Sequence, residues 1–479
     1  MVLFTSYKYG IFVFVAFALV WVVARYVRRP RATAALLLFL SYGFYALWDW
    51  RWCLLLASIT ASGYAGGLWL HANLDRRGQG LRLALLVALN LCILGAFKYF
   101  DFFAASFARL AAHAGIHIDE VTLGLILPIG LSYYTFQNLS YLIDVHRRTV
   151  SPTRDVVSFA CSLAFFPQLL AGPITRPRDL IPQFARRREF DAELAHDGRR
   201  QVLWGLLKKM VIADNIGVRV DAVWATRAHA NSLEVLCAML LYSVQIYCDF
   251  SGYADIAIGT AKLFNVRLAR NFDYPYFSVG IRAFWRRWHM TLSSWARDYI
   301  YISLGGNRVS SWRRNLNVML TFLAIGLWHG ADWTFLAWGA LHGVYNILET
   351  TLARASGRKL EPSQGSTSHG VAVLWAVVTF AAVTFAWVFF RAPSLRAALV
   401  FLSRLAVAPG ALATYRPFVP LLLVSAALFA YEWFTRRWEH GLAVGRLSLP
   451  VRWVAYLAAC LVLLLTGYLG SRSGIYVQF

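Results

Sequence analysis

Charged residues are scarce in this chain of 479 residues. They make up only 15% of the sequence, whereas hydrophobic residues make up 59%. A soluble protein of this length carries more charge and shows polar linkers between its domains. The composition therefore excludes an ordinary soluble enzyme.

Paired cysteines and nucleotide motifs are missing as well. The six cysteines lie within apolar segments and form no CxxC pair, so neither a disulfide framework nor a zinc site is indicated. The chain contains no P-loop, no nucleophile elbow and no zinc motif, which disfavours an ATP-driven pump. We expect no metal and no tightly bound cofactor.

Long apolar runs dominate what is present. Runs that can cross about 30 Å of hydrocarbon recur from end to end, which predicts an all-α polytopic membrane protein with about 10–11 transmembrane helices. Expected spans are 9–24, 32–48, 52–70, 81–97, 124–143, 233–250 with 256–264, 317–349, 371–390, 418–435 and 450–469. Segment 98–120 resembles an interfacial helix, 156–172 a re-entrant element, and 200–220 an amphipathic helix or a weak span.

The excess of basic residues indicates topology. The net charge is +23, but the arginines fall in short loops between apolar runs, as expected of cytoplasmic loops. This pattern predicts membrane lipids as partners, with no nucleic acid, and places both chain termini on the outer face. An anionic lipid headgroup or an anionic donor is a second use of the same charges.

His329 and Asp332 interrupt the apolar stretch 317–349, which we interpret as a hairpin or a broken helix. Ionisable groups at membrane depth are costly and commonly mark a functional path. The alternative is a histidine satisfied by hydrogen bonds in a helix-packing core. Trp328 and Asp332 are candidates for lining a path or supporting His329.

A second histidine, His289, follows an arginine-rich aromatic run. A neutral imidazole suits general-base chemistry near physiological pH, although an interfacial histidine that caps a helix is the alternative. Arg282, Arg286 and Arg287 precede it and could hold a phosphate-bearing donor, because arginine suits bidentate phosphate contacts. Positive-inside topology explains these arginines equally well.

Two further features carry candidate residues. Asp249 and Asp255 do not share a helical face, so we expect each to pair with an arginine of the cytoplasmic loop in a structural role. The chain ends in Gly474-Ile475-Tyr476-Val477-Gln478-Phe479, which is unusually apolar for a tail. It is either an aromatic anchor at the outer interface or a carrier in which the Tyr476 hydroxyl accepts an acyl group.

Several long motifs occur in a consistent order. They are Phe165-Phe166-Pro167-Gln168, Asp249 to Asp255, Asn271 to Tyr276, Phe284 to Trp295, Arg297 to Arg308, and Leu327-Trp328-His329-Gly330. With these runs the chain resembles the membrane-bound O-acyltransferases. The similarity is greatest to their bacterial branch, which includes the membrane subunits of alginate O-acetylation and teichoic-acid D-alanylation.

The resemblance implies helices around a central funnel or tunnel, with His329 catalytic and His289 assisting. It further implies an acyl donor received on the cytoplasmic side, Tyr476 as the acyl carrier, and a periplasmic SGNH-type acetyltransferase partner that completes transfer to a polysaccharide. A path should therefore connect the arginine-rich loop, His329 and the outer face. The chain would form one membrane domain, with N-terminal helices 1–120, catalytic core 121–350, C-terminal helices 351–469 and outer tail 470–479.

We therefore expect a bacterial inner-membrane O-acetyltransferase that uses acetyl-CoA for O-acetylation of an exopolysaccharide. D-alanyl transfer to teichoic acid is the alternative within this class. A channel or flippase would show repeats and broken helices in both halves, which this sequence lacks. A non-catalytic scaffold for polymer secretion would tolerate the loss of His329.

Overall fold

The computed structural model describes residues 4–27, 29–74, 76–119, 121–170, 172–356, 369–468, 470 and 475. Within these ranges the chain is helical and forms no β-strand, which confirms the predicted all-α class. Contacts divide the chain into two compact units with interleaved segments: Met1–Val202 with Ile256–Ala269 and Tyr476–Phe479, and Leu203–Asp255 with Arg270–Ile475.

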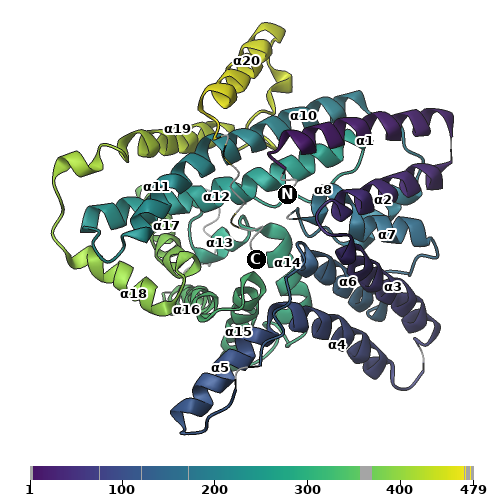
Figure 1. Ribbon diagram of the computed structural model, residues 1–479, viewed down its shortest axis with the longest axis horizontal. Helices are drawn as coiled ribbons and strands as arrows, with labels where there is room; N and C mark the ends of the chain where they lie inside the picture. The colour runs from purple at the N-terminus through teal and green to yellow at the C-terminus, as the bar shows by residue number, and fades with distance from the viewer. Residues whose placement is uncertain are drawn as a thin grey trace. The chain divides into compact units, whose positions relative to one another are not determined.

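The first unit contains most of the N-terminal helices. They are α1 (Tyr7–Tyr26), α2 (Pro30–Ala46), α3 (Trp50–Ala72), α4 (Gln79–Lys98), α5 (Phe100–His113), α6 (Leu131–His146), α7 (Val156–Ala164), α8 (Phe166–Leu169) and α9 (Pro177–Ala185). Helix α6 packs against α3 and α4, and α7 packs against α2 and α9 (Figure 1). Helix α6 is buried along almost its whole length, so its polar residues face protein.

The second unit carries the candidate site. Helices α10 (Ala192–Leu206) and α12 (Ser232–Leu263) each extend from one unit into the other. The remaining helices are α11 (Asp214–Ala225), α13 (Ile281–Trp285), α14 (Met290–Ala296), α15 (Ser311–His329), α16 (Trp333–Ala355), α17 (His369–Arg391), α18 (Leu395–Ser403), α19 (Val419–Thr435) and α20 (Leu449–Thr466). Leu207–Ala213 and Arg297–Tyr301 are π-helices.

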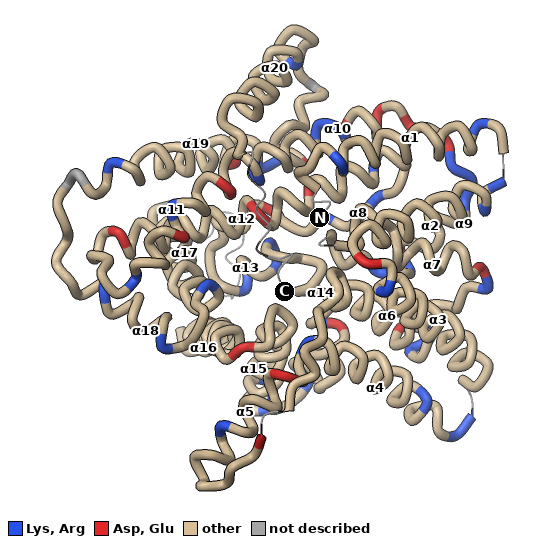
Figure 2. Tube along the Cα trace, in the orientation of Figure 1, with Lys and Arg blue, Asp and Glu red and all other residues tan. Residues whose placement is uncertain are grey.

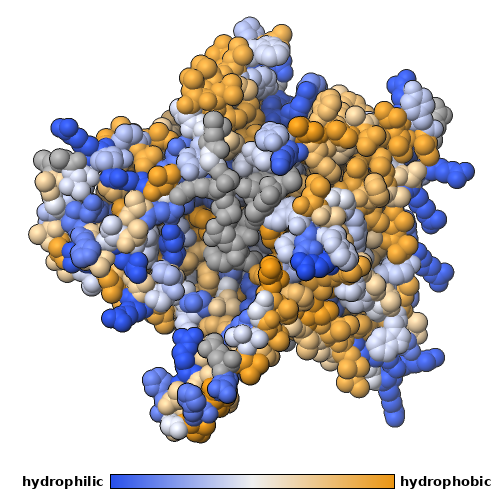
Figure 3. Space-filling model, viewed as in Figure 1, coloured by the Kyte–Doolittle hydropathy of each residue, from blue (hydrophilic) through white to orange (hydrophobic). Residues whose placement is uncertain are grey.

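Six helices of the described part are long and apolar enough to cross a membrane: α1, α3, α4, α12, α17 and α20. Charged residues lie near the ends of α1, α4 and α20 rather than in their middles (Figure 2). Helix α20 exposes Val454, Leu457, Leu461, Leu464 and Leu465, and its surface is strongly hydrophobic in Figure 3. Such faces are suited to lipid.

The break predicted around His329 is present. Helix α15 ends at His329, Gly330 is extended, and α16 begins after Asp332, whose side chain accepts a hydrogen bond from the Thr334 N–H (2.8 Å). The two helices then pack tightly, because a Cβ at Gly326 would collide with the carbonyl of Phe335 and one at Gly339 with that of Phe322. Small residues permit this close backbone approach.

Two local predictions differ from the structure, whereas the helix predicted at 200–220 is present. The span expected at 124–143 becomes helical only at Leu131, because Pro128 has no N–H to donate and Gly130 is left-handed (φ 83°). The region 200–220 is a continuous helical run through a π-helix. The two expected segments 233–250 and 256–264 form one helix, α12.

Candidate functional site

His329 is the last residue of α15 and is only 1% exposed. Aromatic rings enclose its imidazole: the centroids of Trp328 and Trp338 lie at 5.0 Å and that of Phe390 at 5.1 Å. Both tryptophan rings meet it nearly edge to face, at 82° and 90°. The rings of α16 and α17 therefore hold the imidazole in one position at the end of its helix.

His289 lies beside His329, as the resemblance implied. Their ring centroids are 6.4 Å apart, and His289 is fully buried. His289 directly precedes α14, and its backbone is left-handed (φ 41°). Residues other than glycine rarely adopt this conformation. Strain of this kind concentrates at functional sites and needs support from its surroundings.

Asn271 supplies that support, and the sequence analysis did not single it out. Its Oδ1 accepts hydrogen bonds from the Thr291 N–H (3.3 Å) and the Thr291 hydroxyl (2.8 Å), and lies 3.1 Å from His289 Nδ1. Because an amide oxygen only accepts, His289 carries its proton on Nδ1 and its lone pair on Nε2. The one available signal was that Asn271 opens one of the recognised motifs.

Burial keeps His289 uncharged. It lies between helices, outside the candidate membrane spans, and desolvation lowers the pKa of its imidazole to about 3. A neutral ring with a fixed tautomer can accept a proton or a hydrogen bond at Nε2 throughout the physiological range.

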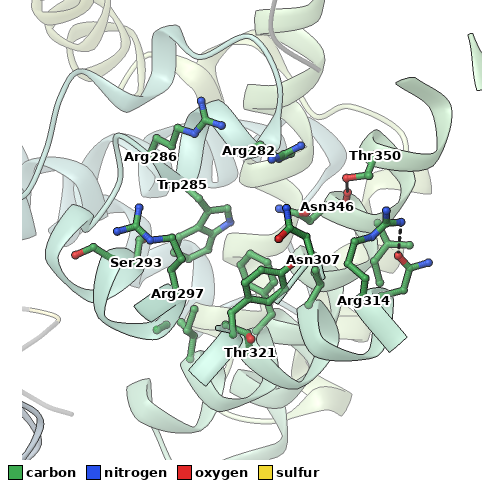
Figure 4. A pocket seen from close by; sticks show the side chains of 18 of the residues that line it. Arg282, Trp285, Arg286, Ser293, Arg297, Asn307, Arg314, Thr321, Asn346 and Thr350 are labelled. Carbon is green, nitrogen blue, oxygen red and sulfur yellow. Dashed lines mark hydrogen bonds between the residues drawn. The ribbon is translucent and has the colours of Figure 1, made fainter. Parts of the chain in front are cut away.

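Arginines surround a cavity of about 610 Å³ in the same unit. Figure 4 shows Arg282, Arg286, Arg297 and Arg314 around it, and Arg354 completes the set among the described residues. Of the residues that line the cavity in the described ranges, none is an aspartate or a glutamate. Such a site favours an anion, and arginine offers the bidentate geometry that phosphate prefers.

The structure separates the predicted arginines into two groups. Arg282 and Arg286 line the cavity, whereas Arg287 is not among the described lining residues. Arg297, Arg314 and Arg354 line it too, although no sequence pattern distinguishes them from the other loop arginines. Distant segments supply them, so local pattern could not identify the set.

Glu349 of α16 fixes the start of α13, which contains Arg282 and ends directly before Arg286. Its carboxylate accepts hydrogen bonds from the N–H groups of Ile281 (2.6 Å) and Arg282 (3.2 Å) at the start of α13. Gly280 precedes them with φ 98°, and a Cβ there would lie 2.7 Å from Glu349 Oε1. Glycine is therefore required at this position.

The cavity approaches the histidines from one side. Val318, Thr321 and Ile325 of α15 line it, and His329 follows on the same helical face, one turn beyond Ile325. Met290, the neighbour of His289, also lines it. Neither histidine is itself among the described lining residues, so a continuous path to the outer face stays a prediction.

A third buried histidine, His342, supports the cavity wall. The Nε1–H of Trp285, a lining residue, donates a hydrogen bond to His342 Nδ1 (3.2 Å). His342 packs on Trp338, whose ring contacts His329. Sequence reasoning missed His342 because a lone histidine in an apolar helix has no local signature.

Asp249 and Asp255 form ion pairs, but the predicted arginine partners were wrong. Lys209 Nζ lies 2.6 Å from Asp249 Oδ1 and 2.7 Å from Asp214 Oδ1, and Lys208 pairs with Asp255. Both lysines lie in the π-helix Leu207–Ala213 and are at most 3% exposed. We call these five residues the lysine–aspartate cluster.

The remaining candidates have simple placements. Trp328 is buried against both histidine rings, with centroids at 5.0 Å from His329 and 5.5 Å from His289. Asp332 caps α16. Tyr476 lies outside the described residues, so its role as a carrier stays a prediction.

The chain is similar to known acyltransferases. A family model for the membrane-bound O-acyltransferase family matches residues 155–380. The chain is 39% identical over 375 residues to the probable alginate O-acetylase AlgI of Pseudomonas aeruginosa, covering 78% of this chain and 69% of that protein. It is 34% identical over 405 residues to the peptidoglycan O-acetyltransferase of Helicobacter pylori, covering 79% and 75% of the two chains.

A more distant relative is the teichoic acid D-alanyltransferase of Bacillus subtilis, 29% identical over 240 residues, which cover 47% of this chain and 60% of that protein. Taken with the fold, these matches establish that the chain belongs to the membrane-bound O-acyltransferase family. It is a multi-pass membrane acyltransferase, and the resemblance seen in its motifs is confirmed.

Proposed function

We propose that this protein is a bacterial inner-membrane O-acetyltransferase that takes acetyl from cytoplasmic acetyl-CoA and passes it outward for O-acetylation of a polysaccharide. The observation that carries the proposal is the arginine-lined cavity, whose α15 wall leads towards His329. Its five arginines match the phosphates of a coenzyme A donor, and the aromatic rings packed around His329 suit a short acyl group.

The chemistry requires a base and an oriented acceptor hydroxyl. His329 takes the hydroxyl proton while the oxygen attacks the thioester carbonyl carbon, so that a C–O bond forms and the C–S bond breaks. The departing thiolate then receives the proton from His329. His289 Nε2, oriented through Asn271, stabilises the His329 imidazolium; such contacts are often long before substrate binds.

The Tyr476 hydroxyl is the proposed acyl acceptor, and a periplasmic SGNH-type partner completes transfer to the polymer. Phenolic oxygen is a competent nucleophile once a base removes its proton. The names of two relatives, each covered over more than two thirds of its length, support O-acetylation of a polysaccharide, such as alginate or peptidoglycan. D-alanyl transfer is less favoured, because that relative matches only 47% of this chain.

The deciding experiment incubates purified protein in lipid nanodiscs with radiolabelled acetyl-CoA. We expect His329→Ala to lower acyl transfer by about 10²–10⁴-fold, the usual contribution of a general base. His113→Ala, at an exposed position on α5, is the matched control. Unchanged labelling in a folded His329→Ala protein would reject the catalytic assignment.

The same assay separates the alternatives. If a D-alanyl-loaded carrier protein labels the chain better than acetyl-CoA does, the result would favour D-alanyl transfer to teichoic acid. Solute transport by vesicles without acyl transfer would favour a channel or flippase, and normal polymer secretion with His329→Ala would favour a scaffold.

A further inference from the structure

The π-helix Leu207–Ala213 is joined end to end with α10 and α11. A π-helix replaces i→i+4 hydrogen bonds with i→i+5 bonds, changes the phase of the side chains and frequently occurs at functional positions. Here it buries two consecutive lysines, Lys208 and Lys209, at 3% and 1% exposure.

The chain that follows α20 returns to this π-helix. The Asn215 side-chain amide donates to the Thr466 carbonyl (2.9 Å), and the Tyr468 N–H donates to the Met210 carbonyl (2.9 Å). A third contact lies further along, where the Ile475 N–H donates to Asp249 Oδ2 (2.7 Å). Ile475 directly precedes Tyr476.

The lysine–aspartate cluster orients the Asp249 carboxylate for this contact. Its Oδ1 is bound by Lys209 Nζ (2.6 Å), and the same ammonium contacts Asp214 (2.7 Å). With Oδ1 engaged, Oδ2 is oriented towards the Ile475 N–H. A hydrogen bond to an ionised carboxylate is stronger than one between neutral groups, and this carboxylate is only 2% exposed.

We propose that the π-helix and Asp249 form an anchor that holds the main chain of the C-terminal segment at Tyr468 and Ile475. Lys209 and Asp214 are positioning residues that act through Asp249. The value of the anchor for acyl transfer rests on the proposed function of Tyr476, but the anchor itself does not.

All three tail contacts use main-chain atoms of the tail. The anchor should therefore tolerate changes of tail side chains, whereas the contacts of Tyr468 and Ile475 should fail where the main-chain N–H is lost. Proline is the one natural residue without a main-chain N–H. This property gives a sharp test in which the folded core is not altered.

The experiment compares Ile475→Pro with Ile475→Ala, each combined with Val477→Cys carrying a nitroxide label in a background with Cys92 and Cys460 replaced by serine. These two native cysteines are exposed. Continuous-wave EPR in nanodiscs should show an immobilised label in Ile475→Ala and a mobile label in Ile475→Pro. Asp249→Asn should give an intermediate spectrum.

Acyl transfer is measured in the same samples. We expect kcat for Ile475→Pro at least tenfold below that of Ile475→Ala, with an unchanged KM for the donor, because the arginine cavity is not touched. Equal label mobility in the two tail variants would overturn the anchor, whatever the activity. A mobile tail with undiminished transfer would keep the anchor and instead remove Tyr476 from the proposed route.

Discussion

Two basic regions of the second unit differ in whether their positive charges are paired with carboxylates. The arginine cavity has five arginines and, among its described lining residues, no carboxylate, although Arg297 pairs with its neighbour Asp298 (2.7 Å). In the lysine–aspartate cluster each lysine lies within 2.7 Å of a carboxylate, and the lysines are almost completely buried. Charge at an open cavity is available to a ligand, whereas buried paired charge holds the protein together.

The largest effect is expected in the cluster. Lys209→Met removes one cation from between two buried carboxylates and should lower stability by about 3–5 kcal/mol, the usual cost of breaking a buried ion pair. Thermal unfolding in detergent measures the loss. Adding Asp249→Asn should recover part of it, because one uncompensated charge disappears. If the Lys209→Met protein were as stable as the wild type, the buried ion pairs of the cluster would not stabilise the fold, and the proposed difference from the arginine cavity would be wrong.

Changes in the cavity should leave stability intact and weaken donor binding. We expect Arg282→Ala with Arg286→Ala to raise the donor KM by about 10²-fold, since each charge-assisted hydrogen bond contributes about 1.5–3 kcal/mol. The effect should decrease with added salt. Arg287→Ala is the matched control, because Arg287 is not among the described lining residues. Equal KM changes in the double variant and the control would mean that Arg282 and Arg286 do not bind the donor and only set the membrane topology.

The smallest expected effect concerns the support of His289. Asn271→Leu removes the acceptor for His289 Nδ1 and should lower kcat by about tenfold without changing the donor KM. In Asn271→Asp the new carboxylate favours the charged imidazole and raises its pKa. The neutral ring is then lost at higher pH, so the acidic limb of the pH–rate profile should move upward. An unmoved profile would show that Asn271 acts only in packing.

Sequence alone predicted the features that depend on local pattern. The apolar runs gave the helical membrane class, and the polar centre around His329 with Gly330 predicted the break between α15 and α16. The motifs identified the family and brought His289 and His329 together as candidates, which the structure places 6.4 Å apart between ring centroids.

What the sequence could not give depends on partners distant along the chain. Asp249 pairs with Lys209, forty positions earlier, because Lys208 and Lys209 lie buried in a π-helix. The hydrophobic pattern of the sequence does not predict a π-helix at this position. Glu349 holds the start of α13 across sixty-eight positions. His342 and Asn271 likewise gain their roles only from contacts made in the folded chain.

The face of α15 has a consequence for which acyl groups the protein accepts. Arg314 and His329 are separated by about 22 Å along the helix, at 1.5 Å per residue. In the proposed function, a donor held by its phosphates near Arg314 would present its thioester at a fixed depth along this face. Trp338 and Phe390 pack against the imidazole of His329, with ring centroids at 5.0 and 5.1 Å. The proposed function therefore predicts that the site selects for acyl-chain length, so that it accepts the shortest acyl groups and excludes fatty ones.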